Sequence, residues 1–124
     1  MYEIPSVGFN KLLYKGNNIW EDSQGINYQK NFNNISIISC PKNIDYVTIW
    51  SFVTEISDGA FADCINLKSI TIPLTVKKIG AYAFRGCSSL YKIDLPECID
   101  IIKRACFKDC ICLYTIGCLH IYHF

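Results

Sequence analysis

The chain has 124 residues, of which 51% are hydrophobic and 19% charged, and this composition excludes a disordered tail because it can bury a core. Twelve basic and eleven acidic residues leave a formal net charge of +1, which indicates neither nucleic acid nor an anionic membrane as a partner. The longest uncharged stretch, residues 110–124, is shorter than the roughly 20 apolar residues that span a bilayer, so no membrane insertion is expected.

Residues 1–42 form an Asn-rich segment. Eight of the nine Asn lie within residues 1–43, among several Gly, and these turn formers separate the apolar residues. We expect irregular structure and short strands here, and the segment is a candidate N-terminal cap. Its start lacks the basic region, apolar run and small-residue cleavage site of a secretory signal. The apolar anchors are Phe9, Leu12, Leu13, Tyr14, Ile19, Trp20, Tyr28 and Phe32.

From residue 53 the sequence repeats with a period of 23 residues and without a gap. The units are 53–75, 76–98 and 99–121, and nine positions recur in kind in each of them. One period earlier, Val47 and Ile49 fall on strand positions, so residues 43–52 form a degenerate unit and the repeats cover residues 43–124. The most regular series are Phe61, Phe84 and Phe107, then Cys64, Cys87 and Cys110, and then Leu67, Leu90 and Leu113.

A unit of this length cannot bury an apolar face alone, so the units are expected to stack as coils of a solenoid. Leu67-x-x-Ile70-x-Ile72-Pro73 alternates apolar and polar residues and predicts a short strand that ends at the proline. After the strand, the residues from Val76 to Gly80 turn the chain, and the spacing to Ala83 and Phe84 suits one helical turn. The predicted class is an α/β solenoid with short parallel strands on one face and short helical or 3₁₀ turns on the other.

The recurring Phe residues are expected to stack through the interior of the solenoid. Burial of each ring is worth roughly 2 to 3 kcal/mol of transfer free energy. The residue before each Phe is Ala60, Ala83 or Cys106, and it must be small because the interior is close-packed.

The segments SITIP, VKKIGAYAFRGC and KIDLP resemble the BspA-like subclass of leucine-rich repeats, whose unit has a strand, Ile-Pro, an Ile-Gly turn and Ala-Phe-x-x-Cys. The third unit departs from this pattern, with Lys103 in place of the turn Gly and Cys106 in place of Ala. The resemblance implies a non-enzymatic protein-binding module. It also implies a cell-surface or secreted location and a role in adhesion, as in family members from bacteria and parasitic protozoa.

In a solenoid of this kind, the outward side chains of the strands form an extended face that can meet a protein partner. Tyrosines near lysine and aspartate suit such a contact, because an aromatic ring supplies interface area while keeping a polar tip. The same residues also suit ordinary solvated strand positions. We call these residues the strand-face set: Lys68, Ser69, Thr71, Tyr91, Lys92, Asp94, Tyr114 and Thr115.

The eight cysteines and two histidines raise the question of chemistry. Cys64, Cys87 and Cys110 mark the repeat, and we interpret them as small buried hydrophobes. A zinc site at the C-terminal cluster is an alternative, although the spacing lacks paired C-x-x-C knuckles. No hydrolase, phosphate-binding or dinucleotide motif is present, so we predict no enzyme activity and no cofactor. The cluster comprises Cys110, Cys112, Cys118, His120 and His123.

A structural role is the other alternative. The apolar segment 114–124, YTIGCLHIYHF, carries no polar cap and could pair with another copy of the chain, which predicts self-association rather than a dedicated ligand.

Overall fold

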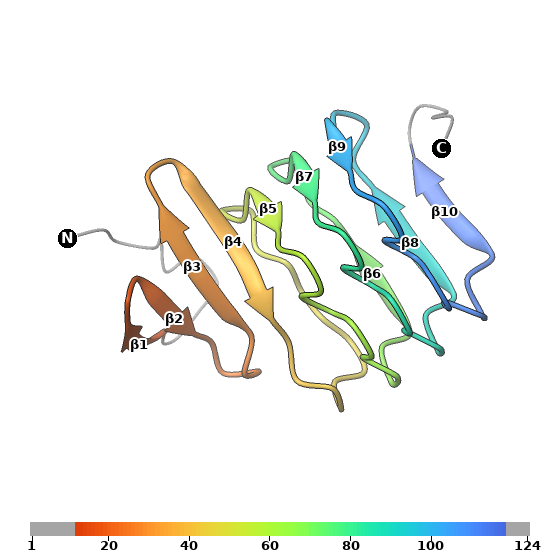
Figure 1. The fold of residues 1–124 in the computed structure, drawn as a ribbon, viewed down its shortest axis with the longest axis horizontal. Helices are drawn as coiled ribbons and strands as arrows, with labels where there is room; N and C mark the ends of the chain where they lie inside the picture. The colour runs from red at the N-terminus through yellow and green to blue at the C-terminus, as the bar shows by residue number, and fades with distance from the viewer. Residues whose placement is uncertain (1–11, 119–124) are drawn as a thin grey trace.

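A computed structural model describes residues 12–118, without the side chain of Cys118, and shows the predicted solenoid (Figure 1). In this part of the chain it contains ten short β-strands and no helix. The strands are β1 Leu13–Gly16, β2 Ile19–Glu21, β3 Asn27–Asn31, β4 Asn34–Ser39, β5 Glu55–Ile56, β6 Ser69–Thr71, β7 Lys78–Ile79, β8 Lys92–Leu95, β9 Ile101–Ile102 and β10 Thr115–Cys118.

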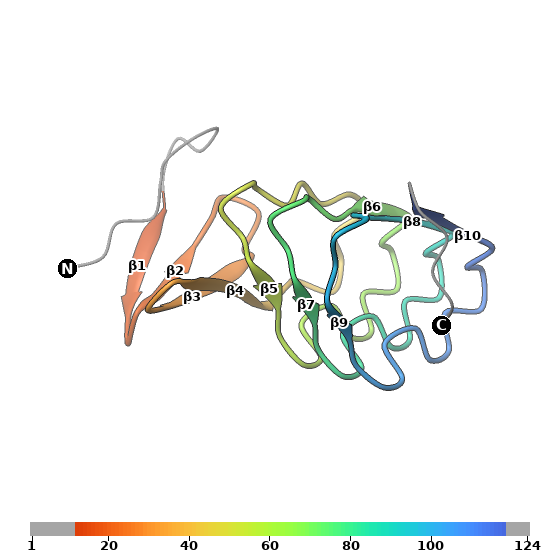
Figure 2. The ribbon, with the colours of Figure 1, turned by 90° about the horizontal axis from the view of Figure 1, so that it is seen from above.

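The strands form two sheets that run along different sides of the coils (Figure 2). One sheet has the order β10-β8-β6, and the other has the order β1-β2-β3-β4-β5-β7-β9. In the three-stranded sheet all pairs are parallel, and Ile70 aligns with Ile93 and Ile93 with Ile116. Each step is 23 residues, so the predicted period and the predicted parallel strands are confirmed.

The parallel strands β5, β7 and β9 were not predicted. The sequence predicts a turn from Val76 to Gly80, yet Lys78 and Ile79 form β7. Ile56 aligns with Ile79, and Ile79 with Ile102, so each coil contributes to a second parallel ladder. These strands are two residues long, too short for an alternating pattern to be visible.

The segments predicted to be helical turns are runs of tight turns, so the α/β class is not confirmed. Each coil has two residues in the left-handed region, which interrupts a right-handed helix. Phe61 and Asp63 donate their N–H groups to carbonyls of the next coil instead of to their own turn. The backbone of this segment therefore links coils, and Phe84 repeats the pattern by donating to Cys106. The left-handed positions are Gly59, Tyr82 and Ala105, with φ of 65°, 58° and 54°, and Asp63, Gly86 and Asp109, with φ of 60°, 74° and 61°.

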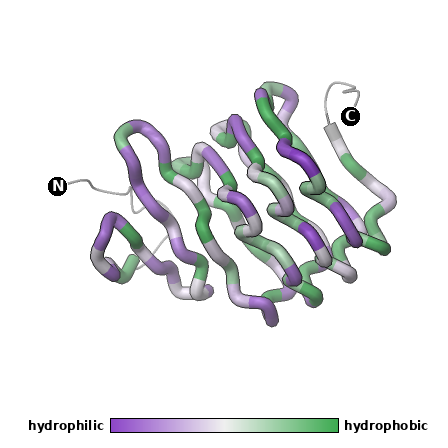
Figure 3. Tube along the Cα trace, in the orientation of Figure 1, coloured by the Kyte–Doolittle hydropathy of each residue, from purple (hydrophilic) through white to green (hydrophobic). Residues whose placement is uncertain are grey.

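The core is a single apolar column between the two sheets, and apolar and polar segments alternate along each coil (Figure 3). The predicted phenylalanine stack is confirmed. The ring centroids of Phe61 and Phe84 are 5.1 Å apart with nearly parallel planes, and those of Phe84 and Phe107 are 5.8 Å apart. Ala83 before the central Phe is fully buried, as close packing of the coils requires.

Close packing of the coils also explains why position 80 is a glycine. A Cβ at position 80 would overlap the backbone N and Oδ1 of Asp58 and lie 2.7 Å from the carbonyl carbon of Ser57. Asp58 needs this approach because its Oδ1 accepts a 2.8 Å hydrogen bond from the Ala81 N–H. Ala81 of the second unit takes the place of Asp58, so no carboxylate competes with Lys103, which stands at the glycine position of the third unit.

The N-terminal strands β1 to β4 form an antiparallel meander, and β4 then pairs in parallel with β5 of the first coil. The meander is organised around the buried carboxylate of Asp22. It accepts 2.9 Å and 3.0 Å hydrogen bonds from the N–H groups of Gln24 and Ile26 and a 2.6 Å hydrogen bond from the Tyr28 hydroxyl. Burial and the neighbouring Asp22 raise the pKa of Tyr28. The role of this segment as a cap stays a prediction.

Candidate functional site

The structure brings the strand-face set together on the three-stranded sheet. Ser69, Lys92 and Thr115 align with one another across the strands, and Thr71 aligns with Asp94. Lys68, Tyr91 and Tyr114 lie one residue before the same strands, where the Tyr91 N–H donates to the Lys68 carbonyl and the Tyr114 N–H to the Tyr91 carbonyl. Side chains from three coils thus share one surface. The set includes five exposed residues, Lys68, Thr71, Tyr91, Lys92 and Tyr114, and three half-buried ones, Ser69, Asp94 and Thr115.

Tyr91 and Tyr114 form an aromatic pair on this surface. Their ring centroids are 6.2 Å apart, and the planes are inclined by only 19°. Tyr91 is 38% exposed and Tyr114 79% exposed, so much of both side chains is open to solvent. The stacking restricts the rotamers of each ring before any partner arrives, which lowers the entropy cost of using them in an interface.

Asp94 is the polar centre of the surface. Its Oδ2 lies 3.8 Å from the Lys92 ammonium and accepts a 3.4 Å hydrogen bond from the Thr71 hydroxyl. A Cβ at position 117 would collide with Oδ1 of Asp94, so Gly117 leaves the space that the carboxylate occupies. Because the Lys92–Asp94 pair is exposed, it contributes little to stability and leaves this part of the surface nearly neutral.

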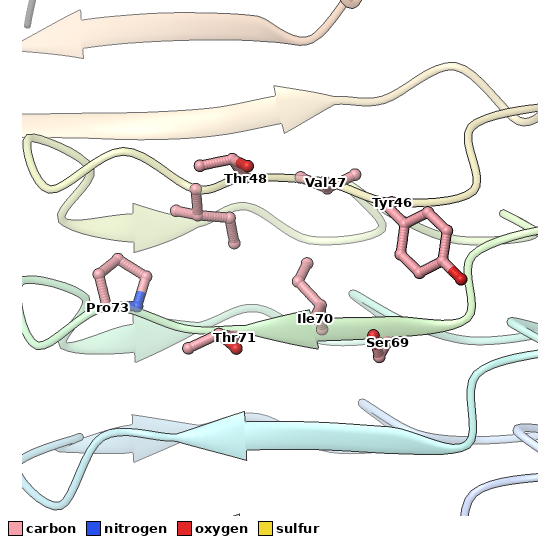
Figure 4. Close-up of a pocket in the computed structure, with 8 residues that line it drawn as sticks. Tyr46, Val47, Thr48, Ser69, Ile70, Thr71 and Pro73 are labelled. Carbon is pink, nitrogen blue, oxygen red and sulfur yellow. The ribbon is translucent and has the colours of Figure 1, made fainter. Parts of the chain in front are cut away.

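A groove of about 350 Å³ lies at one side of this surface, between residues 46–49 and β6 (Figure 4). The two segments are joined by an isolated bridge between Tyr46 and Ser69, whereas β6 and β8 are aligned at three positions. In Figure 4 the side chains of Ile70 and Pro73 extend toward residues 46–49. We call this site the strand-face groove, and it is lined by Tyr46, Val47, Thr48, Ile49, Ser69, Ile70, Thr71 and Pro73.

Sequence reasoning missed Tyr46 and Thr48 as surface residues. It recognised Val47 and Ile49 as inward positions of the degenerate unit but did not extend the outward positions to that unit. The signal was available, because Tyr46 stands one period before Ser69 and Thr48 one period before Thr71.

The repeat cysteines are placed in the interior, where each thiol approaches a backbone carbonyl of the preceding coil. The Cys87 thiol donates to the Phe61 carbonyl at 3.0 Å and the Cys110 thiol to the Phe84 carbonyl at 2.9 Å. Cys64 makes a longer contact, 3.7 Å, with the Pro41 carbonyl. The thiol is therefore a hydrogen-bond donor between coils as well as a small hydrophobe, a role that the periodicity alone did not reveal.

The candidate zinc residues are only partly described. Cys112 is exposed, and the half-buried Cys110 directs its thiol to a carbonyl. The side chain of Cys118 and all of His120 and His123 lie outside the described residues. Within residues 12–118, no group of three or more His, Cys, Asp or Glu side chains is arranged to hold a metal ion.

Cys106 provides a test of thiol burial. Burial raises the pKa of the Cys106 thiol from its ordinary value near 9 to about 12. Its stabilising contribution is therefore complete below pH 9 and is lost between pH 9 and 12, where the unfolded chain releases the proton first. Cys106→Ala, which restores the residue of the other units, is expected to flatten the fall in unfolding free energy by about 1.4 kcal/mol per pH unit. Urea unfolding at pH 9, 10 and 11 measures this, and identical slopes would contradict it.

The stacked coils with in-register parallel strands and a shared aromatic column define a β-solenoid of the leucine-rich repeat class. The chain belongs to the BspA-type leucine-rich repeat family, because the family model described as BspA type leucine rich repeat region (6 copies) matches residues 30–120. Families of this kind are generally non-enzymatic and typically bind proteins. In the described residues, no helix is long and apolar enough to cross a membrane.

Two solved structures are similar to this chain. The leucine-rich repeat protein of T. pallidum is 29% identical, with a TM-score of 0.70 over 76% of this chain and 47% of that one. A leucine rich cell surface protein of Faecalibacterium prausnitzii is 21% identical, with a TM-score of 0.59 over 85% of this chain and 40% of that one, and this likeness concerns the fold alone. The chain thus spans less than half the length of either protein. A comparison with curated proteins finds no match.

Proposed function

We propose that this chain is a non-enzymatic protein-binding module and that the strand-face set is its contact surface. The observation that carries the proposal is the stacked and exposed pair Tyr91 and Tyr114 on a rigid parallel sheet. Tyrosine is enriched among the residues that dominate the energy of protein interfaces. Adhesion at a cell surface is the finer role that we propose, on the basis of membership in the BspA-type family.

Because the surface is nearly neutral, it favours a protein as the partner over a polyanion. Lys92 is paired with Asp94, and the exposed residues Lys68 and Asp45 carry opposite charges. A surface without a net field neither steers nor retains a polyanion. Recognition must then rest on aromatic area, hydroxyl groups and shape.

The proposal predicts that the double variant Tyr91→Ala, Tyr114→Ala loses at least about 30-fold in affinity, since removing a hot spot costs 2 kcal/mol or more. Peptides selected from a random displayed library against the wild-type chain serve as the probe, and affinities are measured by calorimetry. Phe32→Ala is the matched control because it removes an exposed ring, 82% accessible, from the β3–β4 hairpin outside the strand face. Selected peptides that bind the double variant as tightly as the wild type would contradict the proposal.

A second candidate function is self-association through the last described coil. Ile111 is 81% exposed, and Ile101, Tyr114 and Ile116 on the same coil are also exposed. Exposed apolar side chains on both sheets of this coil favour contact with another apolar surface. The native mass distinguishes the two candidates, since only self-association requires a dimer in the absence of any ligand.

A further inference from the structure

We propose that the strand-face groove anchors the partner protein by accepting one uncharged apolar side chain from an extended segment. This inference rests on the proposed function and deepens it, because it assigns the chemistry of the partner at one place. The groove opens on the same sheet as the strand-face set and shares Ser69 and Thr71 with it.

The floor and rim of the groove differ in character. Val47, Ile49 and Ile70 supply carbon surface, and all three are otherwise buried in the core column. The rim carries the hydroxyl groups of Tyr46, Thr48, Ser69 and Thr71. An apolar floor with a few polar groups around it is the arrangement found in ligand pockets, which occupy about 300–1,000 Å³.

Charge excludes an ionised occupant. None of the eight lining residues carries a charge. The Asp94 carboxylate, which contacts Thr71 at the rim, is already paired with Lys92, so an ionised occupant would lose its hydration without gaining an unpaired partner. The nearest charged positions in the sequence, Asp45 and Lys68, have opposite signs and stand next to Tyr46 and Ser69. The groove therefore matches an uncharged side chain.

Hydroxyl groups at the rim favour a peptide over a free hydrocarbon. A hydroxyl both donates and accepts hydrogen bonds, so the rim can pair with the N–H and C=O groups on either side of an inserted side chain. Thr71 already donates to Asp94 through a long, 3.4 Å contact, which a peptide carbonyl could replace. An apolar molecule without amides would leave these groups unused.

The groove is built into the fold. Its first wall belongs to the degenerate unit, where Trp50 replaces the proline that follows the strand in the next unit, Pro73. Both units turn after the strand in the same way, with the Val53 N–H donating to the Trp50 carbonyl and the Val76 N–H to the Pro73 carbonyl. Residues 46–49 nevertheless pair with β6 only through the isolated bridge between Tyr46 and Ser69. On the other side, the Gln24 side chain donates to the Tyr46 carbonyl and fixes this wall to the N-terminal meander.

The test uses N-acetyl-leucine methylamide as the probe and methyl NMR of the whole chain as the readout. We expect saturable shifts at the methyl groups of Val47, Ile49 and Ile70 and no saturable shift with N-acetyl-aspartate methylamide. Ser69→Phe, which places a ring at the groove, should weaken the leucine probe at least 10-fold. Ser39→Phe adds the same ring at an exposed serine of β4 and should leave the affinity unchanged.

Three outcomes would overturn the inference. The first is an absence of saturable shifts in the wild-type chain, which needs no variant and so does not depend on the folding of Ser69→Phe. The second is equal binding of the aspartate probe. The third is isobutanol binding as tightly as the leucine probe, since the site would then take small apolar molecules rather than peptide. If the groove binds no probe, the proposed function can still be tested with the Tyr91→Ala, Tyr114→Ala double variant, because that variant changes a different part of the surface.

Discussion

Replacing Phe84 with alanine is expected to lower the free energy of unfolding by about 3–5 kcal/mol, the largest effect predicted for a single side chain of this protein. Phe84 is fully buried and lies between the rings of Phe61 and Phe107, so its removal leaves a cavity that borders three coils. The surrounding backbone is tied from coil to coil by hydrogen bonds and cannot collapse into that space. Guanidinium unfolding followed by circular dichroism measures the change in midpoint.

Phe32→Ala again serves as the control, because the Phe32 side chain is 82% exposed and should contribute little to stability. If both variants lose similar amounts of stability, the stack does not have the central role that its burial indicates. Phe107→Ala should fall between them, since Phe107 is only half-buried.

Gly80→Ala is expected to cost about 3 kcal/mol, at the upper end of the cost of overpacking. The added methyl group would overlap the backbone of Asp58 and displace the carboxylate that holds the Ala81 N–H, so two neighbouring coils must move apart. Backbone atoms cannot change rotamer to relieve the overlap. The measurement is the same unfolding experiment on the purified variant.

The variant Gly59→Ala distinguishes two possible costs of replacing a glycine, lack of space and an unfavourable backbone conformation. A Cβ at position 59 meets nothing within 4 Å, but φ is +65°, so the expected cost is only the roughly 1–2 kcal/mol of placing a non-glycine residue in the left-handed region. If Gly80→Ala costs no more than Gly59→Ala, the close approach of Asp58 is not the reason for the glycine.

The repeat architecture could be predicted because its cause is visible in single residues. A buried ring or thiol must recur once per coil, and Phe61, Phe84 and Phe107 therefore reveal the 23-residue step directly. The strands of the three-stranded sheet also followed from alternation of apolar and polar residues at Ile70 and Ile72. Within the strands, the outward positions Ser69, Thr71, Lys92, Asp94 and Thr115 follow from the inward ones by alternation, whereas Lys68, Tyr91 and Tyr114 precede the strands.

The rest of the fold depends on backbone conformation that residue type reveals poorly. Tyr82 and Ala105 take the left-handed conformation that Gly59 takes in the first unit, although neither residue type favours it. At Tyr82 the conformation is accompanied by a hydrogen bond from its N–H to the Arg104 carbonyl of the next coil. A pattern of side chains therefore suggested a helical turn where the chain makes tight turns.

The groove and the meander could not be predicted from the sequence pattern, for a different reason. The groove results from a missing ladder between residues 46–49 and β6, and a missing interaction leaves no periodic signal. The meander is held by Asp22, an acidic residue that sequence reasoning places on the surface by default. Its three hydrogen bonds join residues whose proximity only the fold creates.

The constant step between paired residues determines how this chain can lengthen. A second copy of residues 76–98, inserted after residue 98, would find the same backbone partners on both sides, and its Phe84 would extend the aromatic column. Its Gly80 would face Ala81 of the first copy, a smaller neighbour than Asp58. Such a duplication adds one coil and one interface, so the protein grows by equal increments. One extra residue within a strand would instead turn every later side chain of that strand to the opposite face, which explains why the spacing is kept.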